Sequence, residues 1–188
     1  MPQFLKDYIR AFRHKKILKS IVIPKSGVVL DISCSDGKFF DKLHKLSPDL
    51  KLFGIDISSD DIEKAKADFP FANFSQGSAD KLSFENNTFD SAFSIMSLHH
   101  YQNSNDFLKE TYRVLKPRGI LYLADLIPKY TWTQKIHNWK GCPEPYHFER
   151  FYSVKDLEIK LKQLGFSFIE DRKISFIPRV RLLKIQKL

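Results

Sequence analysis

The hydrophobic positions of this chain form short continuous runs, separated by segments in which apolar residues recur every three or four positions. Continuous runs rich in Val, Ile, Leu and Phe are typical of strands buried on both faces of a parallel sheet. The pattern predicts strands at 28–32, 51–57, 89–96 and 120–124, with a weaker strand at 72–76.

Amphipathic segments follow these runs, and they predict helices over 36–46, 60–68, 104–115 and 153–164. Ser58 or Ser59 stands where the second helix would need an N-cap, with acidic residues in its first turn. Gly165 stands where the last helix would end. Lys116-Pro117-Arg118-Gly119 has the composition of a turn.

The chain closes with two strand-like runs, 166–174 and 179–185, on either side of Pro178. Strands that alternate with helices indicate a parallel sheet covered on both faces, and a late strand–turn–strand indicates an antiparallel hairpin. We therefore predict an α/β fold with a Rossmann-like, seven-stranded, mostly parallel sheet. The hairpin should lie at one edge of the sheet, and helices should cover both faces.

Basic residues are concentrated at the two ends of the chain. Residues 1–30 carry seven Lys or Arg against one Asp, and residues 171–188 carry six against one. The first 25 residues predict a basic amphipathic helix, over 4–22, that ends before Pro24. A basic end can contact phosphates or an anionic membrane surface, or it can be a solvated face.

The length of 188 residues fits a single domain, 1–188, and no apolar run is long enough to cross a membrane. The first residues lack the pattern of a signal peptide. Two cysteines, Cys34 and Cys142, are too few for a disulfide framework. The simplest expectation is a protein of the reducing cytoplasm.

Candidate chemistry lies just after the predicted strands, where open α/β sheets bind their ligands. Asp31-Ile32-Ser33-Cys34-Ser35-Asp36-Gly37 ends the first strand, and Asp56 ends the second. The later segments are Gly77-Ser78-Ala79-Asp80, Met96-Ser97-Leu98-His99-His100 and Leu115-Lys116-Pro117-Arg118-Gly119.

This succession, over about residues 25–170, resembles the class I S-adenosylmethionine-dependent methyltransferases. It is most similar to the small-molecule, methyltransferase type 11-like branch that includes quinone-biosynthesis C-methyltransferases. The resemblance implies S-adenosyl-L-methionine as cofactor and a small, apolar or aromatic molecule as methyl acceptor. It implies cofactor-binding roles for Asp31, Ser33, Cys34, Ser35, Gly37, Asp56, Ile57, Ser78, Ala79, Asp80 and Met96.

Residue chemistry supports three of these roles directly. A carboxylate at Asp56 can accept hydrogen bonds from two neighbouring ribose hydroxyls. A short turn of small residues lets the backbone approach the methionine part of the cofactor. Asp31, close to a cationic sulfonium compound, provides a field of the right sign.

The chain departs from the family pattern at three positions. Serines stand at Ser33 and Ser35, where the family usually has glycine, and at Ser78, where it usually has aspartate. A Cβ atom at a position with positive φ costs about 1 kcal/mol. The alternative function is therefore a degenerate, non-catalytic protein that binds the cofactor or serves as a scaffold.

Two other functions fit the sequence less well. The methyltransferases of bases or glutamine place an Asn-Pro-Pro-Tyr-type motif after the fourth strand, where this chain has Met96-Ser97-Leu98-His99, so no nucleic-acid partner is expected. A nicotinamide dehydrogenase needs three glycines before the first helix, and it does not have an acid at the position of Asp31.

The acceptor side has one candidate for catalysis. His99 and His100 follow the fourth strand, and histidine exchanges protons near neutral pH, so His100 is a candidate general base. The aromatic-rich segment 128–152 is the usual place of an acceptor lid in the family. It also contains His137, Cys142 and His147, but their spacing matches no standard metal site, so we predict no metal.

Overall fold

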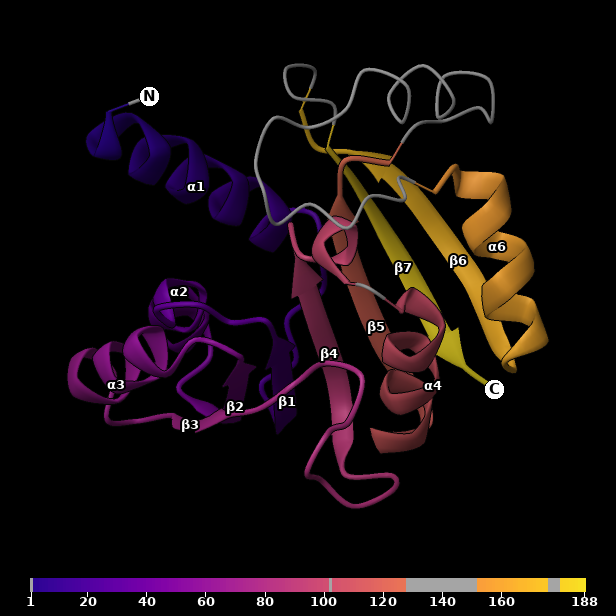
Figure 1. Ribbon diagram of the computed structural model, residues 1–188, viewed down its shortest axis with the longest axis horizontal. Helices are drawn as coiled ribbons and strands as arrows, with labels where there is room; N and C mark the ends of the chain where they lie inside the picture. The colour runs from indigo at the N-terminus through magenta and orange to yellow at the C-terminus, as the bar shows by residue number, and fades with distance from the viewer. Residues whose placement is uncertain (1, 102, 128–151, 176–179) are drawn as a thin grey trace.

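Seven strands form one sheet in the order β3-β2-β1-β4-β5-β7-β6 (Figure 1). The computed structural model describes residues 2–101, 103–127, 152–175 and 180–188. β1 to β5 run parallel, whereas β7 pairs antiparallel with both β5 and β6. This arrangement confirms the predicted mostly parallel sheet with its antiparallel hairpin at one edge. The strands are β1 (Ser26–Ile32), β2 (Asp49–Asp56), β3 (Asn73–Gln76), β4 (Phe89–Ile95), β5 (Leu115–Asp125), β6 (Phe166–Lys173) and β7 (Arg181–Lys187).

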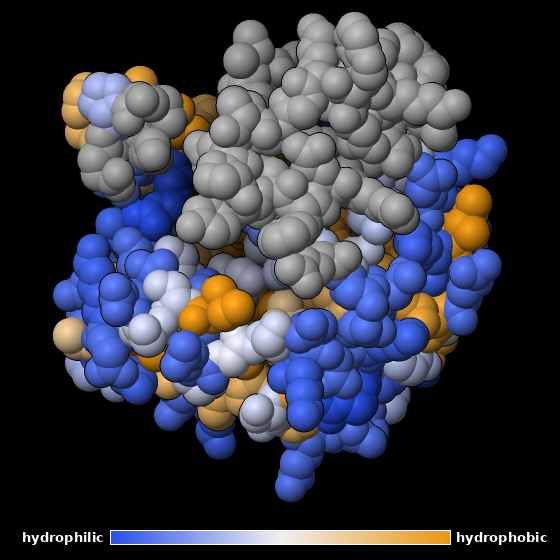
Figure 2. Space-filling model, viewed as in Figure 1, coloured by the Kyte–Doolittle hydropathy of each residue, from blue (hydrophilic) through white to orange (hydrophobic). Residues whose placement is uncertain are grey.

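Helices cover both faces of the sheet and enclose two hydrophobic cores. One core takes its helical residues from α1, α2 and α3, and the other from α4 and α6. In Figure 2 the described surface is mostly hydrophilic, with apolar atoms in separate patches. The helices are α1 (Gln3–Leu18), α2 (Lys38–Leu46), α3 (Ser59–Asp68), α4 (Ser104–Val114) and α6 (Val154–Gln163), with a 3₁₀ turn at Leu98–His100.

Local sequence signals explain where several helices begin and end. Ser58 caps α3 by accepting a hydrogen bond from the Asp61 amide at 3.2 Å, as one of the two predicted caps. At α6, Ser153 and Asp156 form a reciprocal capping box. Gly165 follows α6 with a φ of +89°, which confirms the predicted end of that helix.

One predicted turn is part of a strand in the structure. β5 begins at Leu115 and includes residues 116–119, which we expected to form a turn before it. Phe89 of β4 pairs with Leu115, but Ser91 pairs with Ile120, so the register shifts between them. The extra residues of β5 are accommodated by this irregularity, and Arg118 adopts a φ of +65° there. The turn-like composition therefore marks a bulge inside a longer strand.

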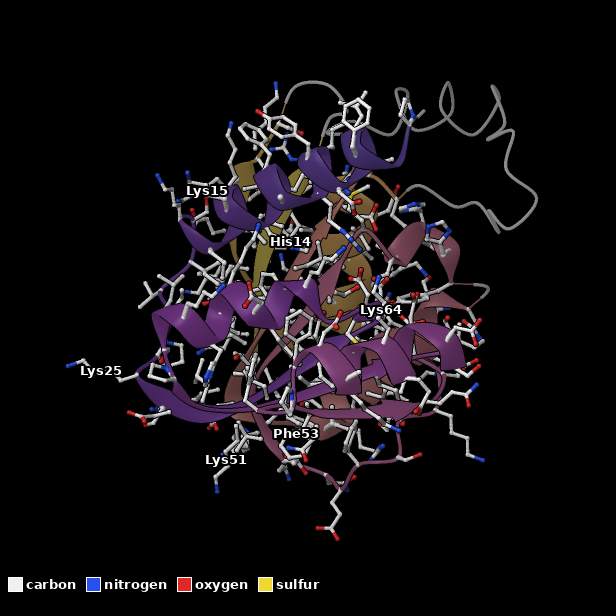
Figure 3. All side chains as sticks on the ribbon, turned by 90° about the vertical axis from the view of Figure 1, so that its left-hand side faces the viewer. His14, Lys15, Lys25, Lys51, Phe53 and Lys64 are labelled. Carbon is white, nitrogen blue, oxygen red and sulfur yellow. The ribbon has the colours of Figure 1, made fainter. Side chains whose placement is uncertain are left out.

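The N-terminal helix is shorter than predicted, and its aromatic residues face solvent. α1 ends at Leu18, and Val22, predicted near its end, is 78% exposed. Figure 3 shows His14 between α1 and α2, with Lys15 on the outer side. The aromatic residues Phe4, Tyr8 and Phe12 are exposed rather than packed in the core. In the part of the chain that the structure describes, no helix is both long and apolar enough to cross a bilayer.

The strand order places one region of the sheet at a topological switch point. The order runs outward in opposite directions from the neighbours β1 and β4. The loops that follow these two strands therefore leave the sheet on opposite faces, and open α/β sheets bind their ligands at such a point. Residues 33–37 and 96–100 of the predicted site lie in these loops, and Asp31 lies near the end of β1.

Candidate functional site

Three residues in the turn after β1 adopt left-handed backbone conformations. Their φ values are +65° for Ser33, +49° for Ser35 and +72° for Gly37. The amides of Ser33 and Cys34 both donate to the Ile55 carbonyl of β2, at 2.8 and 3.0 Å, and hold the turn against the sheet. The two serines thus adopt a conformation for which glycine is the usual choice. This conformation costs about 1 kcal/mol for each serine.

Packing explains why glycine remains at only one of the three positions. A Cβ atom on Gly37 would lie 2.9 Å from Cζ of Phe74 and 3.0 Å from Cδ2 of Phe69. Those distances are shorter than van der Waals contact, so a side chain at residue 37 would displace two aromatic rings. Ser33 and Ser35 are half-buried and have room for their side chains.

Each serine of the turn has a partner that compensates for part of its backbone strain. Ser35 Oγ donates to Asp61 at 3.2 Å. Ser33 Oγ lies 3.0 Å from the Tyr101 hydroxyl, which itself donates to Ser97 Oγ at 3.0 Å. Burial raises the pKa of Tyr101 to about 12, so this hydroxyl keeps its proton at neutral pH. The contact with Tyr101 joins the turn after β1 to the loop after β4.

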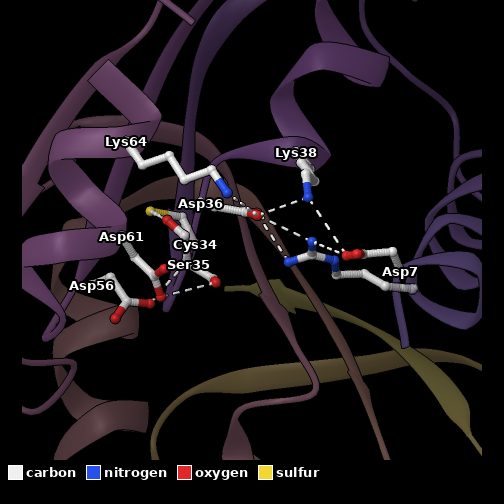
Figure 4. A network of polar contacts seen from close by, with 9 residues as sticks. Asp7, Cys34, Ser35, Asp36, Lys38, Asp56, Asp61 and Lys64 are labelled. Carbon is white, nitrogen blue, oxygen red and sulfur yellow. Dashed lines mark hydrogen bonds and ion pairs between the residues drawn. The ribbon is translucent and has the colours of Figure 1, made fainter. Parts of the chain in front are cut away.

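The carboxylate of Asp56 lies at the end of β2 and holds both loops that flank it. Its Oδ2 accepts from the Ser35 amide at 2.8 Å, and its Oδ1 accepts from the Ser58 amide at 3.0 Å. Figure 4 shows Asp56 next to Ser35 and Asp61. Each carboxylate oxygen has a second lone pair, so both can still accept a hydroxyl from a ligand. Asp56 is half-buried, which leaves it accessible to such a ligand.

Asp31 is a buried carboxylate with an unsatisfied oxygen. The residue is 2% exposed, and its Oδ1 has no hydrogen-bond partner among the described residues. Burial raises the pKa of Asp31 well above its usual value, and the charge of Asp56 raises it further. An unpaired buried carboxyl is costly, and it needs a donor or a positive charge to become favourable. Oδ1 of Asp31 is therefore an acceptor for which the described residues supply no donor.

A cluster of charges connects the turn to α1 (Figure 4). Asp36 accepts two hydrogen bonds from the Arg10 guanidinium, both at 3.0 Å, and its carboxylate lies 3.1 Å from Lys38 Nζ. Burial alone would raise the pKa of Asp36, but the bonds from Lys38 and Arg10 outweigh burial, so the pKa is lower than usual. Asp36 is thus an anchor for α1.

The remaining predicted cofactor residues divide by exposure. Ile57 is 74% exposed although it is apolar, and it directly follows Asp56. Ser78 and Asp80 are exposed, and Ala79 is half-buried. Met96, the residue after β4, is half-buried and adopts a left-handed conformation with a φ of +58°. The side chain of Cys34 lies in the core, where burial raises the pKa of its thiol, so only its backbone is part of the turn.

A buried histidine–aspartate pair joins the turn after β4 to the last residue of β5. His99 Nδ1 is 2.6 Å from Asp125 Oδ1, and the residues are 6% and 1% exposed. A carboxylate can only accept, so with Asp125 ionised a neutral His99 donates from Nδ1, and Nε2 is then the ring nitrogen without a proton. His100, the predicted catalytic residue, is exposed, and its ring centroid lies 4.1 Å from that of His99.

Comparison with known proteins identifies the family. Residues 30–123 match the methyltransferase domain family. The chain belongs to this family.

Two curated relatives are an O-methyltransferase, rstn1, of Aspergillus nomiae and a demethylmenaquinone methyltransferase of Chlorobaculum tepidum. The first is 30% identical over 76% of this chain and 65% of its own length, and the second is 26% identical over 70% and 54%. This chain thus spans less than two thirds of the length of either relative. An S-adenosylmethionine-dependent methyltransferase of Aquifex aeolicus shares the fold, with a TM-score of 0.72 at 19% identity, over 93% of this chain and 89% of that one.

Family membership implies S-adenosylmethionine as the cofactor, and the residues fit it. The unpartnered oxygen of Asp31 suits the amino group of a cationic cofactor, and Asp56 suits a pair of hydroxyls. The segment 128–151, with the predicted lid and with His137, Cys142 and His147, lies outside the described residues.

Sequence reasoning missed four partners of the candidate site: Arg10, Asp61, Tyr101 and Asp125. Asp125 had a usable signal, since it is an acid at the end of the fifth predicted strand. The other three are brought to the site by helix and loop packing, which has no local sequence pattern.

Proposed function

We propose that this protein is an active S-adenosylmethionine-dependent methyltransferase that methylates a hydroxyl group on a small apolar or aromatic molecule. The observation that carries the proposal is the pair of acids Asp31 and Asp56 at the ends of neighbouring parallel strands, facing a turn with three left-handed residues. The relatives that act on small molecules, including an O-methyltransferase, support the acceptor class.

Different residues would bind the different parts of the cofactor. Asp31 would accept from the amino group, and the backbone of Ser33, Cys34, Ser35 and Gly37 would line the methionine portion. The ribose hydroxyls would bind Asp56. The adenine would lie against the exposed Ile57, beside the loop that contains residues 78–80, and near Met96.

The bound cofactor supplies an electrophilic methyl group on its sulfonium, and the protein must align an acceptor with it. A hydroxyl acceptor loses its proton during transfer, so a base increases the rate. The buried contact of His99 with Asp125 supports Nε2 of His99 as the atom that takes this proton, since the carboxylate stabilises the imidazolium that forms. His100 remains a second candidate base.

Aromatic residues of the segment 128–152 would form the wall of the acceptor pocket. Tyr152 is the one member of this segment that the structure describes, and its hydroxyl accepts from Ser104 Oγ at 2.6 Å. That bond ties the end of the proposed lid to the start of α4.

The first experiment measures cofactor binding by calorimetry with S-adenosylmethionine and S-adenosylhomocysteine. We expect affinity in the micromolar range. Activity is then measured as S-adenosylhomocysteine release and as transfer of a deuterated methyl group to phenol, catechol and a naphthohydroquinone. A role for the base predicts that His99→Gln and Asp125→Asn lower the rate without changing cofactor affinity. His100→Gln, measured beside them, decides which histidine acts.

A second candidate function is a cofactor-binding protein without catalysis. The observation that favours it is the loss of family residues at Ser33, Ser35 and Ser78, which leaves the adenine without a charged acceptor at residue 78. Cofactor binding without methyl transfer to any of the acceptors would favour this candidate. No heat of binding with either cofactor form would contradict both functions.

We also propose a reducing, cytoplasmic location, because Cys34 is a free, buried thiol. Recovery of the protein from the cytoplasmic or membrane-associated fraction of cells, rather than from the secreted fraction, would agree with this location.

A further inference from the structure

The helix α1 presents its aromatic side chains to solvent. Phe4 is 74% exposed, Tyr8 68% and Phe12 45%. These three residues are four positions apart, so they form one stripe along the helix. An exposed aromatic stripe of this length is unusual in a soluble domain and marks an interaction surface. Figure 2 shows apolar atoms at the surface at the upper left, where α1 begins.

Polar contacts hold α1 in this orientation. Arg10 binds Asp36 through two hydrogen bonds, and Lys42 Nζ donates to the Ala11 carbonyl at 2.9 Å. His14 is 7% exposed and packs edge-on against Phe39, with ring centroids 5.3 Å apart. Rolling the helix to bury its aromatic stripe would break these contacts. The outward direction of the stripe is therefore part of the folded structure.

Lysines continue the same face toward the end of the helix. At 100° per residue, Lys15, Lys16 and Lys19 project over the arc that contains Tyr8 and Phe12, and all three lysines are exposed. Lys16 Nζ lies 4.8 Å from the centre of the Phe12 ring. The acidic residue of α1, Asp7, is partly exposed and is paired with Arg10 at 2.8 Å. The face is thus aromatic in its first half and cationic in its second.

We propose that this outer face of α1 docks on an anionic phospholipid surface. Aromatic rings partition into the boundary between headgroups and acyl chains, and lysines bind lipid phosphates. A second copy of the chain is a poorer occupant, because a symmetric contact would bring together two N-terminal segments of the same sign of charge. The net charge of +6 over residues 1–30 matches an anionic partner.

Docking would orient the methyltransferase site relative to the membrane. α1 lies at the end of the sheet toward which β4 points (Figure 1), which is the end where the proposed site lies. Arg10 connects the helix to Asp36, one residue before Gly37 of the cofactor turn. An apolar acceptor dissolved in the bilayer could then reach the site directly. This last consequence rests on the proposed function, whereas the docking itself does not.

Vesicle sedimentation with the full chain tests the docking. The probes are vesicles of phosphatidylcholine alone and of phosphatidylcholine with about one third phosphatidylglycerol. We expect binding to the anionic vesicles that weakens steeply between about 0.1 and 0.5 M NaCl. Replacing Lys15, Lys16 and Lys19 together by Gln should weaken binding about a hundredfold. Replacing Phe4, Tyr8 and Phe12 together by Ser should weaken it at least tenfold and leave thermal unfolding unchanged.

Matched variants keep the test specific. The charge control is the triple Gln variant of Lys51, Lys81 and Lys155, which are exposed lysines outside α1. Figure 3 places Lys51 at the opposite end of the molecule from Lys15. The apolar control replaces the exposed residues Leu46 (61%) and Ile159 (49%) by Ser. Both controls should bind vesicles within about twofold of the wild type, because neither changes a residue of the outer face of α1.

Three results would overturn the proposal. One is equal binding to neutral and anionic vesicles. Another is an equal loss of binding in the charge control and in the α1 lysine variant. The third is a wild-type dimer in solution that the aromatic variant converts to monomers, which would assign the face to a second copy. None of these results depends on methyl transfer, so failure of the docking is distinguishable from failure of the proposed function.

Discussion

Replacing Asp31 by Asn is expected to stabilise the ligand-free protein while it damages cofactor binding. The carboxyl is 2% exposed, and its Oδ1 has no partner. An unsatisfied buried polar group costs about 1–3 kcal/mol, and an ionised one costs more. Asparagine has nearly the same shape but cannot ionise. For a domain of this size, relief of that cost raises Tm by about 2–10 °C near pH 8.

The pH dependence gives the sign of this effect. Burial, then the charge of Asp56, raises the pKa of Asp31 in the folded protein above its usual value of 3.8. Between these two pKa values the folded state holds a proton that the unfolded state has released, so stability falls as pH rises. The advantage of Asp31→Asn should therefore be small at pH 4, grow with rising pH, and level off above the folded pKa. Thermal unfolding of both proteins across this range measures it.

Cofactor binding should change in the opposite direction. Loss of a buried charge that pairs with the cofactor's amino group costs about 2–5 kcal/mol, which is at least a thirtyfold loss of affinity. Calorimetry with S-adenosylmethionine measures this loss, and Asp68→Asn at an exposed acid is the matched control. Unchanged affinity in Asp31→Asn, or a variant no more stable than the wild type at pH 8, would refute the assignment of Asp31 as an unpaired acid held ready for a cation.

Three further predictions follow from the same geometry. Gly37→Ala should lower the free energy of unfolding, measured by urea titration, by about 2–4 kcal/mol. The new Cβ atom would be held in a left-handed backbone conformation and would clash with the ring of Phe74. A loss below about 1 kcal/mol would contradict this reasoning. Tyr101→Phe should lower the free energy of unfolding by about 1 kcal/mol. The loss should be smaller in a Ser33→Gly background, because the hydroxyls of Ser33 and Tyr101 bond each other. Equal losses in the two backgrounds would show that the two hydroxyls act independently. Burial, and next the charge of Lys42, lowers the pKa of His14 in the folded protein to about 3. As the pH falls below 6.5, the unfolded chain therefore takes up a proton at His14 while the folded protein does not, and stability falls. Relative to His14→Leu, the wild type should lose about 2 kcal/mol of stability between pH 6.5 and 5, and a constant difference between the two proteins would show that His14 is not buried as a neutral ring.

The sequence predicted the sheet well because each strand has a local signature. Buried parallel strands are continuous apolar runs, and the helices between them have caps and amphipathic spacing. It placed Asp31 and Asp56 at strand ends for the same reason. It failed at residues 116–119, where turn-like residues form a bulge that only pairing with β4 requires.

The direction of α1 shows the limit of pattern reasoning. The periodicity of its apolar residues predicted a helix, and a helix forms. Periodicity cannot say which face of a helix meets the protein, because that depends on what the neighbouring surface offers. Here Asp36 and the ring of Phe39 select Arg10 and His14, and the aromatic stripe remains outside.

By itself, the sequence determined the order of strands and helices, the two acids at strand ends and the family to which the turn after β1 belongs. These features depend on residues close together in the chain. The tertiary structure alone decided that Ser33 and Ser35 can replace glycine whereas Gly37 cannot, that Tyr101 supports the turn, and that His99 pairs with Asp125. Each of those outcomes depends on a group 26 or more residues away along the chain, brought into contact only when the sheet assembles.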